Sequence, residues 1–156
     1  MRIQSILAFA VLCLAVRAAS QDAPKLPTPV QCKFSDGTKI SVYYSNWRKR
    51  YVFTTTGSLV TIKGARVPSG HYAISPVKGE DNNWTLKMVK QVLRLGDRQP
   101  PLLPMSVATK ALPVETFPVV FDQTGGSCTM YWAQKDSNSL LSLEFTRENA
   151  DVPVSN

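Results

Sequence analysis

The segment from Tyr43 to Tyr51 (YYSNWRKRY) gathers the side chains best suited to hold a ligand. It joins four aromatic residues with three consecutive cations. Aromatic faces can stack on sugar rings, and guanidinium and ammonium groups can hold carboxylates or phosphates. The segment therefore predicts a surface for an anionic or glycan ligand, built from Tyr44, Trp47, Arg48, Lys49, Arg50 and Tyr51. The alternative is a strand end with core aromatics and a solvated basic turn, whose charges deter edge-to-edge aggregation.

Catalytic chemistry has few residues to use in this chain. His71 is the single histidine. A histidine that acts as a general base needs a nucleophile or a water, and usually an orienting carboxylate. No sequence spacing places a carboxylate beside His71. We expect a structural or solvated histidine, with a small hydrolase that pairs His71 with a distant carboxylate as the alternative.

Neither a metal nor another cofactor is expected. Zinc would need several His, Cys or carboxylate ligands, and one histidine with two bonded cysteines leaves too few. Residues 80–83 (EDNN) are the cluster best suited to calcium. They lack the glycine-punctuated loop of an EF-hand, so we interpret them as a polar hairpin loop.

Residues 1–20 have the layout of a cleavable signal peptide. Met1 and Arg2 give a positive start, residues 6–16 (ILAFAVLCLAV) form an uncharged apolar run, and residues 18–20 (AAS) supply the small residues of a cleavage site. The apolar run is too short for a spanning helix. We expect a periplasmic or secreted protein that begins near Gln21, with no transmembrane segment after the signal is removed.

Removal of the signal peptide changes both the charge and the cysteine count. Arg2 and Arg17 leave with it, which lowers the formal net charge from +7 to +5. Such a charge favours weak attraction to anionic surfaces. It is smaller than the positive charge typical of nucleic-acid-binding domains, so no nucleic-acid partner is expected. Cys13 also leaves, and Cys32 and Cys128 remain as an even pair in an oxidising compartment. We predict a disulfide between them; the alternative is two separate buried thiols.

Alternating apolar residues and frequent turns predict strands through most of the mature chain. Residues 21–29 are a Pro-rich tether, residues 30–148 a strand-rich domain, and residues 149–156 a C-terminal tail. No convincing amphipathic helix interrupts the pattern, and residues 91–104 are expected to form a long surface loop. Closely spaced strands with short turns predict an all-β fold, a single antiparallel two-layer β-sandwich of about eight strands. Its expected core is Trp84, Leu86, Met88, Phe117, Val119, Phe121, Met130, Trp132, Leu141, Leu143 and Phe145.

The order of parts in residues 53–90 resembles a known family. A Thr-rich strand precedes a strand that ends at Lys63-Gly64, and a VPSGHY turn (67–72) and a Trp84-Thr85 strand follow. This order is similar to that of the exported bacterial proteins known as the domain-of-unknown-function 2911 family, whose members show a Leu-Pro-Ala-Gly-x-Tyr turn and a later Trp-Thr strand. Residues 112–132 also resemble the closing strands of that family. The resemblance covers most of residues 30–148 and implies a β-sandwich and bacterial export, without a known activity.

Two loops depart from the family pattern. Trp47-Arg48 matches a Trp-Arg pair, but Lys49-Arg50-Tyr51 replaces the Gly-Ala-Asn turn that follows it in the family. Residues 91–104 stand where the family has a loop that contains Gly-Trp. A site that the family builds on either loop would be lost or changed here.

We therefore expect a non-enzymatic, exported bacterial binding or envelope-associated module, for which an anionic or glycan component of the cell envelope is the expected ligand. Besides the hydrolase, a structural subunit that pairs with a partner through an exposed strand edge is the second alternative.

Overall fold

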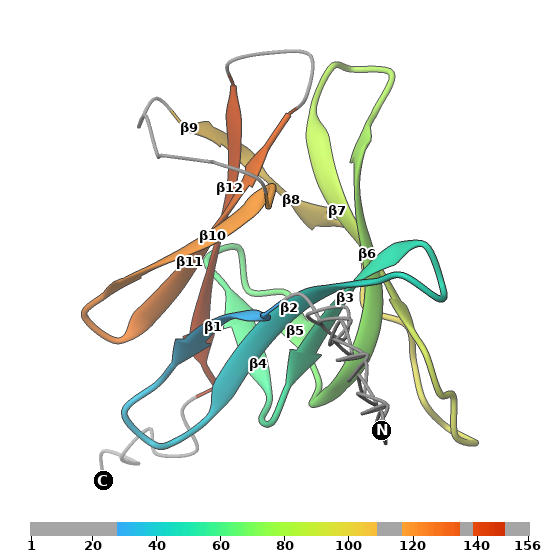
Figure 1. Cartoon of the computed structure of the whole chain (residues 1–156), viewed down its shortest axis with the longest axis vertical. Coiled ribbons are helices and arrows are strands. Elements are labelled where there is room, and N and C mark those ends of the chain that lie inside the picture. The colour runs from blue at the N-terminus through green and yellow to red at the C-terminus, as the bar shows by residue number, and fades with distance from the viewer. Residues whose placement is uncertain (1–27, 109–116, 135–138, 149–156) are drawn as a thin grey trace, which may run out of the picture.

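The alternating patterns of the sequence become two antiparallel β-sheets in the computed structural model (Figure 1). The structure describes residues 28–108, 117–134 and 139–148. The expected signal peptide, most of the tether and the expected C-terminal tail lie outside these residues. The described residues contain no helix, and hence none that is long and apolar enough to cross a membrane.

The first sheet has the order β1–β2–β3–β6–β7–β8. Its strands are β1 (Val30–Lys33), β2 (Lys39–Ser45), β3 (Arg50–Thr55), β6 (Gly70–Lys78), β7 (Trp84–Lys90) and β8 (Leu103–Pro104). The second sheet has the order β10–β11–β12–β4–β5, and β9 also pairs with β12. Its strands are β4 (Leu59–Thr61), β5 (Arg66–Val67), β9 (Ser106–Ala108), β10 (Val119–Thr124), β11 (Ser127–Ala133) and β12 (Leu140–Arg147).

The predicted β-sandwich is confirmed, and the strand count is higher than expected. The described residues hold twelve strands, where the sequence predicts about eight. Three of the additional strands are very short: β5 and β8 have two residues each and β9 has three. Such short pairings carry too few alternating residues to be recognised from the sequence.

Every second residue of the main strands faces the space between the sheets, as the period of two requires. Eight of the eleven expected core residues are buried: Leu86, Met88, Val119, Met130, Trp132, Leu141, Leu143 and Phe145. The other three, Trp84, Phe117 and Phe121, are partly buried and pack against this core. Tyr72 and Phe53 are its largest fully buried side chains, and their rings lie 6.5 Å apart between centroids.

Two loops show where the sequence interpretation holds and where it fails. The polar segment 79–83 is a hairpin loop between β6 and β7, as expected, closed by a hydrogen bond of 2.8 Å from the Gly79 N–H to the Asn83 carbonyl. The long loop after β7 ends at residue 102 rather than at Pro104, because Leu103 and Pro104 form β8 beside β7. Leu103 pairs with Leu86 and is fully buried. Burial of this side chain in the core therefore places the end of the loop beside β7.

A disulfide joins the two sheets. Cys32 lies on β1 at the edge of the first sheet and Cys128 on β11 in the second, with their Cα atoms 6.2 Å apart and their sulfur atoms bonded. Both residues are buried in the core, so the predicted pairing is confirmed. The bond spans a sequence separation of 96 residues and therefore ties the first core strand to a late one.

Opening this disulfide should destabilise the domain strongly. The disulfide stabilises the folded state because it restricts the conformations of the unfolded chain. For a loop of this length, its loss should lower the free energy of unfolding by about 4 to 5 kcal/mol. Denaturant unfolding with and without reductant measures the difference, and a Cys32→Ser, Cys128→Ser variant should show no further loss on reduction. Two titratable thiols at Cys32 and Cys128 in the unreduced, folded protein would contradict the pairing.

An ion pair makes a second connection between the sheets. Asp36 lies in the turn between β1 and β2, and its Oδ2 accepts a hydrogen bond of 2.7 Å from Nε of Arg147 on β12. Arg147 also donates to the Ser58 carbonyl. The hydrogen bond from Arg147, helped by the Thr38 backbone N–H, lowers the pKa of Asp36 from 3.8 to about 2.

The stabilising effect of this pair should depend on pH. Because the pKa of Asp36 is lower in the folded chain, the unfolded chain takes up the proton first as the pH falls. The contribution is complete above the unfolded pKa of 3.8 and is lost as the pH falls through about 2. The difference in unfolding free energy between the wild type and Asp36→Asn should therefore be largest near neutral pH and shrink in acid. A difference that stays constant from neutral pH down to about pH 2 would refute this role.

Candidate anion-binding site

The hairpin between β2 and β3 carries the basic residues that the sequence singles out. Four residues, 46–49, link the two strands, and Lys49 adopts a left-handed backbone conformation with φ of 52°. The Ser45 hydroxyl accepts a hydrogen bond of 3.2 Å from the Arg48 backbone N–H, which closes the turn. Trp47 is exposed at the tip, and the Arg48 guanidinium carbon lies 5.2 Å from the centroid of the indole ring. The hairpin thus presents an aromatic ring and a cation together.

Tyr44 and Tyr51 lie behind this tip, on the inner side of the sheet. The two residues are direct partners across β2 and β3, and their ring centroids are 4.9 Å apart. Tyr51 also meets Trp132 of the second sheet at 4.9 Å, and Phe117 at 5.6 Å. Burial raises the pKa of Tyr51, with the neighbouring Tyr44 adding to the effect. These two tyrosines are therefore part of an aromatic cluster between the sheets.

The structure divides five of the six predicted site residues between two hollows. Tyr44, Lys49, Arg50 and Tyr51 line one of about 620 Å³, which we name the Tyr51 hollow; Trp132 and Gln134 are also in its wall. Arg48 lines a different hollow of about 510 Å³, which we name the Arg48 pocket. Trp47 lines neither of the two.

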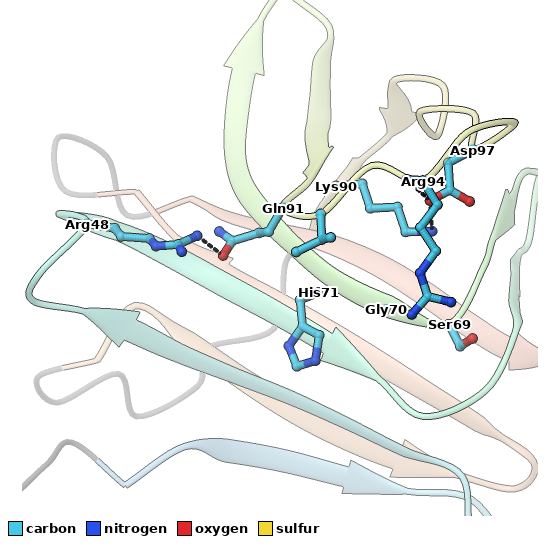
Figure 2. A pocket seen from close by; sticks show the side chains of 9 residues that line it. Arg48, Ser69, Gly70, His71, Lys90, Gln91, Arg94 and Asp97 are labelled. Carbon is cyan, nitrogen blue, oxygen red and sulfur yellow. Dashed lines mark hydrogen bonds and ion pairs between the residues drawn. The ribbon is translucent and has the colours of Figure 1, made fainter.

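Three segments distant in the sequence form the Arg48 pocket (Figure 2). Arg48 comes from the hairpin. Residues 69–71 come from the turn before β6 and the start of that strand. The end of β7 and the loop after it supply Lys90, Gln91, Val92, Arg94 and Asp97. The Arg48 guanidinium donates a hydrogen bond to Oε1 of Gln91, which ties the hairpin to the loop (Figure 2).

Backbone hydrogen bonds fix the start of the loop. Strand β7 pairs with β6 through Lys90 opposite Tyr72, and the Gln91 N–H donates to the His71 carbonyl at 2.9 Å. The Lys90 N–H donates at 2.8 Å to the side chain of Gln99, farther along the loop. The pairing of β6 with β7 therefore sets the position of Gln91 in the pocket wall.

Asp97 is neutralised by its own surroundings. Its Oδ2 accepts hydrogen bonds from the Arg94 backbone N–H at 2.8 Å and from Nζ of Lys90 at 2.9 Å. These two contacts, the Arg94 N–H first, lower the pKa of Asp97. The carboxylate and the Lys90 cation thus compensate each other, and the charges of Arg48 and Arg94 remain for a ligand.

Gln91 adds a donor that the protein itself does not use. Its Nε2 is buried and has no hydrogen-bond partner among the described residues, while its Oε1 is taken by Arg48. A buried donor without an acceptor is unfavourable, and an anion with several oxygens would supply one. Two guanidinium groups, an amide N–H and the exposed Ser69 hydroxyl together suit a phosphate, sulfate or carboxylate group.

The structure gives His71 no catalytic partner among the described residues. His71 is exposed on β6, on the side opposite the buried Tyr72. Its side chain has no hydrogen-bonded carboxylate in this part of the chain, and Asp97, in the same pocket wall, is already bound by Lys90 and Arg94. Nor do three or more His, Cys, Asp or Glu residues gather in a way that could hold a metal ion within the described ranges.

Comparison of the chain with family models, with curated proteins and with solved structures finds no match. The resemblance to the domain-of-unknown-function 2911 family therefore stays a prediction.

Proposed function

We propose that this protein is an exported, non-enzymatic binding module that holds an anionic group of its ligand in the Arg48 pocket. One observation carries the proposal. Arg48 and Arg94 line the same pocket, and its wall also contains Gln91 with an unpartnered side-chain N–H, while the pocket's carboxylate is already neutralised by Lys90 and the Arg94 backbone. Charge-assisted hydrogen bonds from arginine to an anion are roughly twice as strong as hydrogen bonds between neutral groups.

The Tyr51 hollow supports a ligand larger than one anionic group. The β2–β3 hairpin and its flank supply Arg48 to the Arg48 pocket and Lys49 and Arg50 to the Tyr51 hollow. The Tyr51 hollow also has aromatic rings and a second buried amide nitrogen without a partner in the described chain, Nε2 of Gln134. A glycan with a phosphate, sulfate or carboxylate substituent has the chemistry to contact both hollows.

The cross-sheet disulfide supports a place outside the cytoplasm. Disulfides of this kind persist in oxidising compartments and are rare among cytosolic proteins. The signal-peptide layout of residues 1–20 points to the same location. We therefore place the ligand in the periplasm, in the cell envelope or outside the cell.

Neither alternative function is favoured. A hydrolase would need a carboxylate that orients His71, and the described residues bring none to it. A subunit that pairs through a strand edge would need a long free edge, but the outer strands β5 and β8 have only two residues each. The edge strands β1 and β10 lie close to each other, which limits the access of a further strand to either edge.

Removing either arginine should weaken anion binding. We expect Arg48→Ala and Arg94→Ala each to bind inorganic phosphate, sulfate or a sugar phosphate about tenfold more weakly, because each loses a charged hydrogen-bond donor. Isothermal titration calorimetry measures the affinity.

The matched controls are Lys33→Ala and Lys63→Ala, which remove exposed cations from elsewhere on the surface and should leave the affinity unchanged. An equal, small loss in all four variants would mean that only the overall charge matters, and the pocket would not be the site.

A further inference from the structure

Large apolar side chains that face solvent gather on two loops beside the Arg48 pocket. The described residues have nine such side chains, and five of them belong to the β2–β3 hairpin or to the loop 91–102: Trp47, Val92, Leu93, Leu95 and Leu102. Leu95 is 108% exposed and Trp47 85% exposed. Patches of exposed apolar residues on a soluble domain usually mark a surface that binds a partner or a membrane.

The two loops form one surface. The hydrogen bond from Arg48 to Gln91 joins them at the pocket, whose wall also includes Val92. Both loops project beyond β6 on the same side of the molecule (Figure 1). Leu95 lies inside the tight turn from Arg94 to Asp97, closed by a 3.0 Å backbone hydrogen bond, so its side chain stands on a tip rather than in a groove.

Cations alternate with these apolar residues. Arg48, Lys49 and Arg50 follow Trp47, and Arg94 and Arg98 flank the exposed Leu95. The one carboxylate of these two segments, Asp97, is bound to Lys90. The surface is therefore complementary to a layer that is anionic outside and apolar beneath.

We propose that the β2–β3 hairpin and the loop 91–102 dock the protein on an anionic lipid bilayer. Trp47, Leu93 and Leu95 enter the interfacial layer, where tryptophan is favoured and leucine leaves water. Arg48 and Arg94 hold headgroup phosphates, and the other cations are attracted by the anionic lipid surface. This inference rests on the proposed function, because it makes the anion of the Arg48 pocket a lipid phosphate.

Loop tips favour a bilayer over a folded protein partner. A protein interface buries a closely complementary core with polar residues at its rim. Here the most exposed apolar side chains stand on separate tips, with cations directly beside them in the sequence. A fluid layer can accept such separate tips without matching their shape.

Vesicle co-sedimentation of the exported protein tests the docking. Vesicles of equal parts phosphatidylcholine and phosphatidylglycerol should bind the wild type, and vesicles of phosphatidylcholine alone should bind it much more weakly. A Leu93→Ser, Leu95→Ser variant should bind the anionic vesicles about tenfold more weakly, since two apolar side chains no longer leave water. The matched control is Ile62→Ser, Val107→Ser, which changes two other exposed apolar side chains (74% and 62%, against 59% for Leu93 and 108% for Leu95) outside these loops, and it should bind like the wild type.

Tryptophan fluorescence gives a second readout without a leucine substitution. Trp132 is buried and Trp84 partly buried, whereas Trp47 is exposed at the hairpin tip. Anionic vesicles should shift the emission of the wild type to shorter wavelength, and Trp47→Phe should abolish that shift. Equal binding to both vesicle types, or wild-type affinity in the leucine variant, would overturn the docking.

A titration with soluble glycerol phosphate separates the two proposals. If glycerol phosphate binds in a manner that needs Arg48 and Arg94 but anionic vesicles do not bind, the anion site stands and the membrane inference fails. If neither binds, both fail. The Leu93→Ser, Leu95→Ser variant should retain its affinity for glycerol phosphate, because these leucines are not in the pocket wall.

Discussion

Strand β6 is the element on which the placement of the site depends. It hydrogen-bonds to β3 on one edge and to β7 on the other, so it fixes the hairpin before β3 and the loop after β7 relative to each other. The buried Tyr72 anchors β6 against Phe53, and its hydroxyl donates to the Pro68 carbonyl at 2.6 Å, which holds the turn that enters the strand. His71, the outward-facing neighbour of Tyr72, and Gln91, whose N–H binds the His71 carbonyl, then lie in the pocket wall. A polar site on the surface is thus positioned by apolar packing beneath it.

Most of the fold can be predicted from local patterns in the sequence, namely alternating apolar residues in the strands and turn residues between them. Strands such as Trp84–Lys90 alternate clearly, and the hairpin loop after β6 has typical turn residues, so both are predictable. The disulfide is predictable because Cys13 lies in the expected signal peptide, which leaves Cys32 and Cys128 as one pair. The short strands β5, β8 and β9 are not, because long-range packing creates them. Leu103, for example, is drawn onto β7 by burial rather than by any local preference for a strand.

The candidate site was only half accessible from the sequence. The run from Tyr43 to Tyr51 identifies the basic hairpin, but the β-strand period turns Tyr44 and Tyr51 inward, where they meet Trp132. Tyr44 and Tyr51 are separated from Arg48 because strand β2 ends and the turn begins before Arg48. The sequence alone does not define that boundary. Gln91 and Arg94 were missed because they reach the pocket through the pairing of β6 with β7. The sequence does carry one signal for this loop, the alternation of leucine with arginine in residues 92–98 (VLRLGDR). A loop that only connects two strands would not need such a pattern.

The most direct test of the anion site is a nuclear magnetic resonance titration that observes side-chain N–H groups with inorganic phosphate. The central claim is that the anion lies between Arg48, Gln91 and Arg94. We predict that the Nε2 protons of Gln91 and the guanidinium protons of Arg48 and Arg94 shift together, with one common affinity. Shifts confined to Arg50 and Gln134 in the Tyr51 hollow, with an unchanged Gln91 amide, would contradict the account.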